Sequence, residues 1–258
     1  MNKKVLILSG SPRKGGNSDL LCDEFARGAT EAGHNVEKIR VSEKNIHPCI
    51  ACYHCSKNSG ACVFKDDIAE ILQKMIDADV LVLASPVYFY SIDAQLKAVI
   101  DRTVARWLEV KNKEFYYITT MADNEKSSAD TTLACFRGYA DCVEGAVEKG
   151  TVVAGGVYEK GEIKNHPAIK LAYQMGKGKV LAITGTNGKT TTTAMLGKIM
   201  SEYLDSVYVV GNIGTPYTSV ALDTKEETVT VAEISSFQLE TALTFRPHVS
   251  AILNITPD

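Results

Sequence analysis

The sequence lacks a long hydrophobic run, an excess of basic charge, internal repeats and low-complexity segments. The apolar run Val5 to Leu8 is too short for the core of a signal peptide, and no stretch approaches the length that crosses a bilayer. With 28 basic and 31 acidic side chains the formal net charge is −3, so no basic field favours nucleic acid or an acidic membrane surface. We therefore expect a cytoplasmic protein with neither nucleic acid nor membrane as a partner.

Cysteine is present at seven positions, and a cytoplasmic location argues against a framework of disulfides. Cys22, Cys135 and Cys142 fall in expected helices, where free cysteine behaves as a small core residue. The other four are crowded into one segment with the spacing C-x2-C-x2-C-x6-C, namely Cys49, Cys52, Cys55 and Cys62. Thiolates are soft metal ligands, so the segment predicts a metal site or a redox role.

Apolar, β-rich runs alternate with helical patterns along the chain, which is typical of an α/β fold with a parallel sheet covered on both faces. The expected strands of the first part are Lys4–Ser9, Asn35–Val41, Val80–Ala84, Glu114–Thr120 and Thr151–Val157, with helices near 17–32, 66–77, 93–108, 131–147 and 165–176. A doubly wound sheet binds ligands beyond the carboxyl ends of its strands. We expect the site in the loops after strands one, three and four.

A second series follows the short connection Gly176-Lys177-Gly178. Its expected elements are a strand at Lys179–Thr184, a helix near 189–204, and strands near 206–210, 228–233 and 249–254. The predicted domains are therefore residues 1–176 and residues 177–258.

Two loops of the first series predict a bound flavin. The loop SGSPRKGGNS (residues 9–18) follows a strand and opens a helix, where backbone N–H groups favour a phosphate. Ser11, Asn17 and Ser18 add side-chain hydrogen bonds, and Arg13 adds charge-assisted ones. The loop SPVYFYS (residues 85–91) follows the central strand and offers the apolar wall and backbone donors that an isoalloxazine ring needs.

The motifs SGSPRKGGNS and SPVYFYSIDAQLKAVIDR resemble those of the NADPH-dependent FMN reductase family, over residues 1 to about 176. The resemblance implies a flavodoxin-like, FMN-dependent NAD(P)H oxidoreductase in which the flavin carries out the chemistry and no side chain is a general acid or base. It implies a small-molecule or protein electron acceptor and a homodimer. The implied FMN contacts are Ser9, Ser11, Arg13, Asn17 and Ser18 around the phosphate, and Pro86, Val87, Tyr88, Phe89 and Tyr90 around the ring.

The cysteine spacing resembles that of the iron–sulfur flavoproteins, a branch of the same family. That resemblance implies a 4Fe-4S cluster held by Cys49, Cys52, Cys55 and Cys62. Two alternatives stay open at this point. The four residues are reduced thiols without a metal, or they bind zinc with His54 as an optional ligand.

The second series begins with a phosphate-binding loop. TGTNGKTTT (residues 184–192) follows a strand and starts a helix, although Ile183 stands where the commonest P-loop pattern has its first glycine. Three further motifs follow this loop, namely VGNIGTP (210–216), EISSFQLE (233–240) and ILNITPD (252–258). Together the four motifs resemble the central ATP-binding domain of the Mur ligases. The resemblance is strongest to the branch that adds D-glutamate to UDP-N-acetylmuramoylalanine. The implied contacts are Gly185, Asn187, Gly188 and Lys189 for ATP phosphates, Thr190 and Glu233 for Mg²⁺, and Asn212 along the substrate groove.

Two other functions compete with the flavoenzyme. The first is an ATP-dependent ligase fragment of peptidoglycan synthesis, which we expect to be inactive alone because its UDP-binding domain, the rest of its sheet and its amino-acid domain are lacking. The abrupt junction and ending predict a fused or truncated reading frame. The second is a non-catalytic flavin- or nucleotide-binding module.

Overall fold

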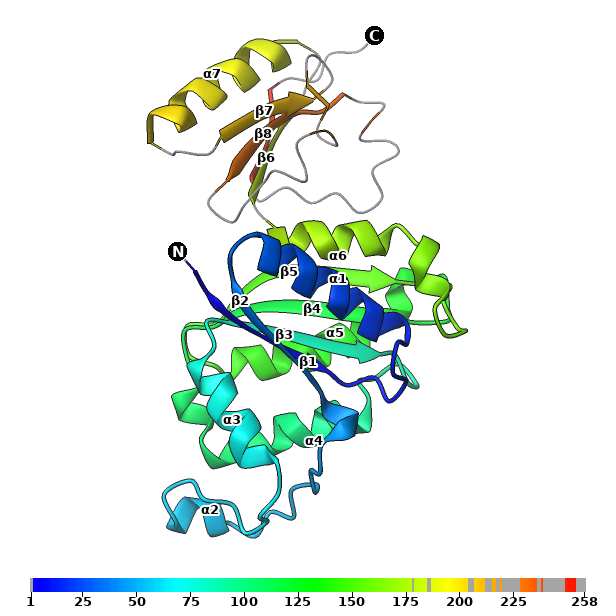
Figure 1. Ribbon diagram of the computed structural model, residues 1–258, viewed down its shortest axis with the longest axis vertical. Coiled ribbons are helices and arrows are strands. Elements are labelled where there is room, and N and C mark those ends of the chain that lie inside the picture. Colours follow the sequence, from blue (N-terminus) through cyan, green and yellow to red (C-terminus); the bar gives the residue numbers. More distant parts are fainter. Residues whose placement is uncertain are drawn as a thin grey trace. The chain divides into compact units, whose positions relative to one another are not determined.

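The computed structural model describes residues 2–177, 179–184, 187–203, 207–211, 215–216, 219, 228–235, 238 and 249–253. The chain divides into two compact units, shown in Figure 1. One unit comprises Asn2–Thr30 and His34–Tyr173, and the other comprises Gln174–Asp258 together with Met1 and Glu31–Gly33. The predicted domain boundary at residue 176 stays a prediction.

The first unit is a parallel sheet with the strand order β2-β1-β3-β4-β5, which confirms the predicted flavodoxin-like fold. Helices α1 and α6 lie on one face of this sheet, and α3, α4 and α5 lie on the other (Figure 1). The strands are β1 (Lys4–Ser9), β2 (Asn35–Arg40), β3 (Val80–Pro86), β4 (Glu114–Thr120) and β5 (Val147–Ala154). The helices are α1 (Asn17–Glu31), α2 (His54–Lys57), α3 (Ile68–Asp77), α4 (Ala94–Arg102), α5 (Asp130–Asp141) and α6 (Ala168–Lys177).

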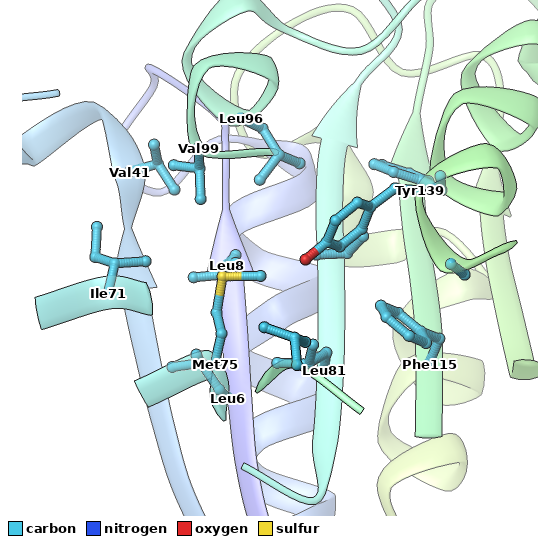
Figure 2. Close-up of a cluster of buried hydrophobic side chains, with 14 of the residues drawn as sticks. Leu6, Leu8, Val41, Ile71, Met75, Leu81, Leu96, Val99, Phe115 and Tyr139 are labelled. Atoms are coloured by element: carbon cyan, nitrogen blue, oxygen red, sulfur yellow. The ribbon is translucent and has the colours of Figure 1, made fainter. Parts of the chain in front are cut away.

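The core beneath α3, α4 and α5 follows from the apolar periodicity of the sequence (Figure 2). Alternate strand residues such as Leu6, Leu8 and Leu81 point to this face and are buried. Helix α3 meets them with Ile71 and Met75, which lie one turn apart on its apolar side. Burial of each such side chain stabilises the fold by roughly 1.5–3 kcal/mol.

Several expected element boundaries are wrong. Helix α5 ends at Asp141 instead of reaching residue 147, and β5 starts at Val147, four residues before the expected strand. The reason lies at Gly145, which has φ +71° and packs so closely on Asn112 that a Cβ would meet its Oδ1 at 2.2 Å. Helix α4 also ends early, at Arg102, and the 3-10 turns η2 (Thr103–Ala105) and η3 (Trp107–Glu109) follow it.

The second unit contains a parallel sheet with the order β7-β8-β6-β9. Its strands are β6 (Lys179–Thr184), β7 (Val207–Gly211), β8 (Val229–Glu233) and β9 (Val249–Ile252), and its helix is α7 (Lys189–Tyr203). Ile183, Val229 and Val231 form a small buried core. The arrangement is consistent with the predicted partial Mur ligase domain. Across the part of the chain that the structure describes, no helix is long and apolar enough to span a membrane.

Candidate functional site

A cleft lies at the carboxyl ends of the first unit's strands. It brings together the two loops that the sequence singled out, although they are about 70 positions apart in the chain. The lining residues are Ser11, Arg13, Asn17, Ser18, Pro86, Val87, Tyr88, Thr120, Met121, Ala122, Val157 and Tyr158. Predicted residues supply seven of these twelve positions. Ser9, the last residue of β1, donates from its Oγ to Asp19 Oδ1 at 3.2 Å.

The loop after β1 is held in shape by the protein itself. Gly10 N donates to Ala84 O at 2.8 Å, and Gly15, with φ +65°, donates its N–H to Asp19 Oδ2 at 2.8 Å. Burial alone would raise the pKa of Asp19, but the Gly15 N–H and the ammonium of Lys38, 3.1 Å away, hold that pKa below its ordinary value. These contacts within the protein hold the loop in shape.

The side chain of Ser18 is the feature of the cleft that best fits an anion. Its side chain is 1% exposed and lines the cleft, and its Oγ has no hydrogen-bond partner among the described residues. Other buried hydroxyls in the described part of the chain also lack a partner, but this one lines the cleft in the first turn of α1, where backbone N–H groups favour negative charge. Ser11, also buried, lines the same part of the cleft. These residues fit the terminal phosphate of a flavin nucleotide.

Arg13 and Asn17 line the cleft but point to the loop after β5. Arg13 Nη1 donates to Tyr158 O at 3.0 Å. The Asn17 amide donates from Nδ2 to Glu159 O at 3.0 Å and accepts at Oδ1 from the N–H groups of Gly161 and Ile163, at 3.0 and 3.3 Å. The side chain of Asn17 therefore positions this loop, and its predicted contact with the phosphate stays a prediction.

The loop after β3 forms a strained two-residue turn at the mouth of the cleft. Tyr88 and Ser91 exchange both backbone hydrogen bonds, at 2.9 and 3.0 Å. Between them Phe89 and Tyr90 have φ +48° and +61°, a region where Asn-Gly is the usual choice. Each non-glycine residue there costs roughly 1–2 kcal/mol. The two side chains are 101% and 60% exposed, so only Pro86, Val87 and Tyr88 of the predicted ring contacts line the cleft.

Sequence reasoning missed the contribution of the loop after β5. Val157 and Tyr158 line the cleft, whereas the prediction placed the site after strands one, three and four. Gly155-Gly156 directly follows β5, and the carboxyl ends of parallel strands meet at one edge of the sheet, so this pair was the available signal. Thr120, Met121 and Ala122 complete the wall at the end of β4.

The cysteine segment contacts α4 through Arg102, which also forms a buried ion pair with Asp66. Arg102 donates from Nη1 and Nη2 to the two carboxylate oxygens of Asp66, both at 2.9 Å, and from Nη2 to Cys62 Sγ at 3.1 Å. Cys49 and Cys52 are exposed, whereas Cys55 is half-buried. In the described part of the chain, no three His, Cys, Asp or Glu side chains are grouped so that they could hold a metal ion. The residues as arranged do not fit a cluster or zinc.

In the second unit, the predicted nucleotide loop leads into α7. Gly188 has φ +80°, and α7 begins at Lys189, next to the exposed Thr190. Glu233 is 3% exposed at the end of β8, where it pairs in register with Ile183 at the end of β6. Asn187 is exposed, and Gly185 and Asn212 lie outside the described residues. The predicted Mg²⁺ ligand Glu233 is thus near the strand that carries the loop.

Fold and cleft together define a flavodoxin-like protein with a glycine-rich loop beside an apolar wall. The match to the family described as NADPH-dependent FMN reductase extends over residues 3–134, just over half of the chain. The chain belongs to this family. Residues 183–258 match the Mur ligase middle domain.

Solved structures similar to the chain share its fold. An NAD(P)H:quinone oxidoreductase from Methanothermobacter marburgensis has a TM-score of 0.57 and 17% identity, with 68% of this chain and 95% of that one covered. An FMN-dependent NADH-azoreductase from Bacillus anthracis, in complex with FMN, has a TM-score of 0.53 and 18% identity, with 68% and 98% covered. The Trp repressor binding protein from Bacillus subtilis has a TM-score of 0.50 and 23% identity, with 67% and 99% covered.

Curated relatives match a different part of the chain. The UDP-N-acetylmuramoylalanine–D-glutamate ligase of Lachnoclostridium phytofermentans is 66% identical over 90 residues, and that of Lachnospira eligens is 64% identical over 90 residues. These matches cover 35% of this chain and 20% of each ligase. The chain therefore spans about a fifth of the length of the ligases that it matches.

Proposed function

We propose that the first unit is an FMN-dependent NAD(P)H oxidoreductase that holds the flavin in the cleft between the loops after β1 and β3. The observation that carries the proposal is the buried, unpartnered Ser18 Oγ at the start of α1, beside an apolar wall of Pro86 and Val87. Membership of the FMN reductase family supports it. The electron acceptor, the homodimer and the cytoplasmic location stay predictions.

The chain's own residues bind and orient the flavin. Ser11 and Ser18 would hold the phosphate, while the charge of Arg13 lies at the rim of the same loop. Pro86, Val87 and Tyr88 would form the wall against the ring. Bound FMN would accept a hydride from the nicotinamide and pass electrons on. In this account, no described side chain acts as a general acid or base.

Substitution of Ser18 by alanine is expected to weaken FMN binding about tenfold, because one hydrogen bond to a charged phosphate is lost. Binding is measured by calorimetric titration of flavin-free protein. The same preparations, loaded with excess FMN, are mixed with NADPH or with NADH without oxygen, and bleaching of the flavin absorption reports reduction. Ser127→Ala, a substitution in the turn η4 (Lys126–Ala129), is the matched control and should leave both readouts unchanged. Wild-type protein that binds FMN but is reduced by neither NADPH nor NADH would contradict the proposal.

The iron–sulfur interpretation of the cysteine segment stays a prediction, and no electron-transfer step is assigned to it. Cys49, Cys52, Cys55 and Cys62 all lie in the described part of the chain, and no three of them are grouped so that they could hold a metal ion. Iron and acid-labile sulfide in cluster proportions, measured on protein prepared without oxygen, would show that these residues come together around a cluster.

We propose nucleotide binding as a second function, carried by the other unit. The supporting observation is the buried Glu233 at the strand end beside the loop that leads into α7. Ligase activity belongs to the much longer relatives, and we do not assign it to this chain. Lys189→Met is expected to weaken Mg²⁺-ATP binding at least tenfold, because the charge beside the phosphates is lost. Lys198→Met, on the same helix, is the control. Equal binding by both variants would contradict the assignment.

A further inference from the structure

The loop between β5 and α6 runs directly along the phosphate-binding loop. We call residues 158–162 the strap. Tyr158 O accepts from Arg13 at 3.0 Å, and Glu159 O accepts from Asn17 at 3.0 Å. The side chain of the next strap residue, Lys160, lies close to Gly15. A Cβ added at Gly15 would be 3.5 Å from Lys160 Cε. Successive strap residues therefore contact the loop at positions 13, 17 and 15.

The position of the strap is determined at both of its ends. The carboxylate of Glu162 accepts from the N–H groups of Tyr158 and Glu159 at 2.6 and 2.8 Å, which closes the strap on itself. Asn17 Oδ1 accepts from Gly161 N and also from the N–H of the fully buried Ile163. Since Asn17 opens α1, one side chain joins the start of this helix to the far end of the strap.

This geometry limits what can extend beyond the phosphate site. Resting on the proposed flavin site, we propose that the strap closes the phosphate end of the cleft and makes it selective for a flavin that ends in a phosphate monoester, so that a flavin dinucleotide is rejected. The dinucleotide carries a second phosphate and a nucleoside beyond the first phosphate. Those groups need the space that the backbone of Tyr158 and Glu159 occupies.

Displacement of the strap is opposed by specific contacts. To admit a dinucleotide, the strap must give up its two hydrogen bonds to the Asn17 amide, from Asn17 Nδ2 to Glu159 O and from Gly161 N to Asn17 Oδ1. It must also release Arg13 from Tyr158 O. With the monoester bound, all of these contacts persist, and the positive charges of Arg13 and Lys160 stay beside the phosphate. Tyr158 and Asn17 thus act as specificity-determining and positioning residues.

The test compares three flavins on the full chain after removal of bound flavin. Calorimetric titration gives dissociation constants for FMN, FAD and riboflavin with the wild type, Asn17→Ala and Glu162→Ala. Wild-type protein is expected to bind FAD about 100-fold more weakly than FMN, and both variants should lower that ratio at least tenfold. Glu162→Ala changes an exposed side chain of the strap. If Asn17→Ala fails to fold, the FAD-to-FMN ratio can still be measured on the Glu162 variant.

Ser42→Ala is the matched control. Ser42 Oγ donates to Ser11 O at 3.2 Å, so this variant removes a hydrogen bond to the phosphate-binding loop without touching the strap, and the FAD-to-FMN ratio should stay unchanged. Wild-type protein that binds FAD as tightly as FMN would overturn the inference. So would variants that weaken FMN and FAD equally. Folded wild-type protein that binds none of the three flavins would overturn the proposed function itself, which is a distinguishable result.

Discussion

Substitution of Gly10 by alanine is expected to abolish FMN binding and to lower the free energy of unfolding by about 2–3 kcal/mol. A Cβ at this position would lie 2.0 Å from Asp93 Oδ2. Asp93 cannot retreat easily, because it is buried and its Oδ1 accepts from Leu96 N at 2.9 Å as the cap of α4. Overpacking here therefore displaces the first residues of the phosphate-binding loop and the start of α4 together. Urea unfolding and FMN titration measure the two effects.

The control is Gly138→Ala on α5. Outside the neighbouring residues and nearby backbone of its own helix, no atom lies within 4 Å of the Cβ that this substitution would add. Helix interiors favour alanine over glycine by about 0.5–1 kcal/mol. The control should therefore be slightly more stable than wild type and bind FMN normally. If the Gly10 variant had wild-type affinity for FMN, the loop after β1 would not be the phosphate site.

The second large effect is expected at the ion pair of Asp66 with Arg102. Asp66→Ala should lower the free energy of unfolding by about 3–5 kcal/mol, because it leaves the Arg102 guanidinium buried without its counter-charge. The side chains of Arg102 and Asp66 are 2% and 1% exposed, and the pair is bidentate. Urea unfolding at neutral pH measures the loss.

Two controls separate this pair from an ordinary ion pair. Asp101→Ala removes the partner of Lys97 on α4, the helix that also carries Arg102. This ion pair, at 2.5 Å, is exposed to solvent, so its loss should lower the free energy of unfolding far less. The double variant Asp66→Asn with Arg102→Met removes both buried charges and should recover part of the loss. Equal destabilisation by Asp66→Ala and Asp101→Ala would contradict the assignment of a buried pair.

The ion pair of Asp66 with Arg102 predicts that acid lowers the free energy of unfolding. Burial alone would raise the pKa of Asp66, but hydrogen bonds from Arg102 and from the N–H of His47 outweigh it and hold that pKa below its ordinary value. The folded state therefore favours the ionised carboxylate, which stabilises the protein above the unfolded pKa of about 3.9. That stabilisation is lost as the pH falls from about 4 through the lower folded-state value.

The sequence predicted the sheet and most of the cleft because both depend on local patterns. Strand β1 is a continuous apolar run, and α3 repeats its apolar residues at helical spacing, so each element could be recognised without its neighbours. Ser18 was placed correctly at the start of α1, since a strand, a glycine-rich loop and a helix are adjacent in the sequence. Parallel topology then brought Pro86 and Val87 to the same edge.

The features that the sequence did not predict depend on distant contacts. Nothing local to Asn17 indicates that its amide binds the backbone of a loop more than 140 residues away. The turn at Phe89 and Tyr90 has a backbone conformation that its residue types disfavour, so local preference predicts the opposite. The ion pair of Asp66 with Arg102 could not be predicted either, because the two residues are 36 positions apart and only the fold brings them into contact.

Titration of the flavin-free full chain with FMN decides whether the first unit binds this flavin. We expect saturation at one FMN per chain, weaker binding by the Ser18 variant and no binding by the Gly10 variant. Protein that is folded, shown by a cooperative unfolding transition, and yet takes up no FMN would contradict the account.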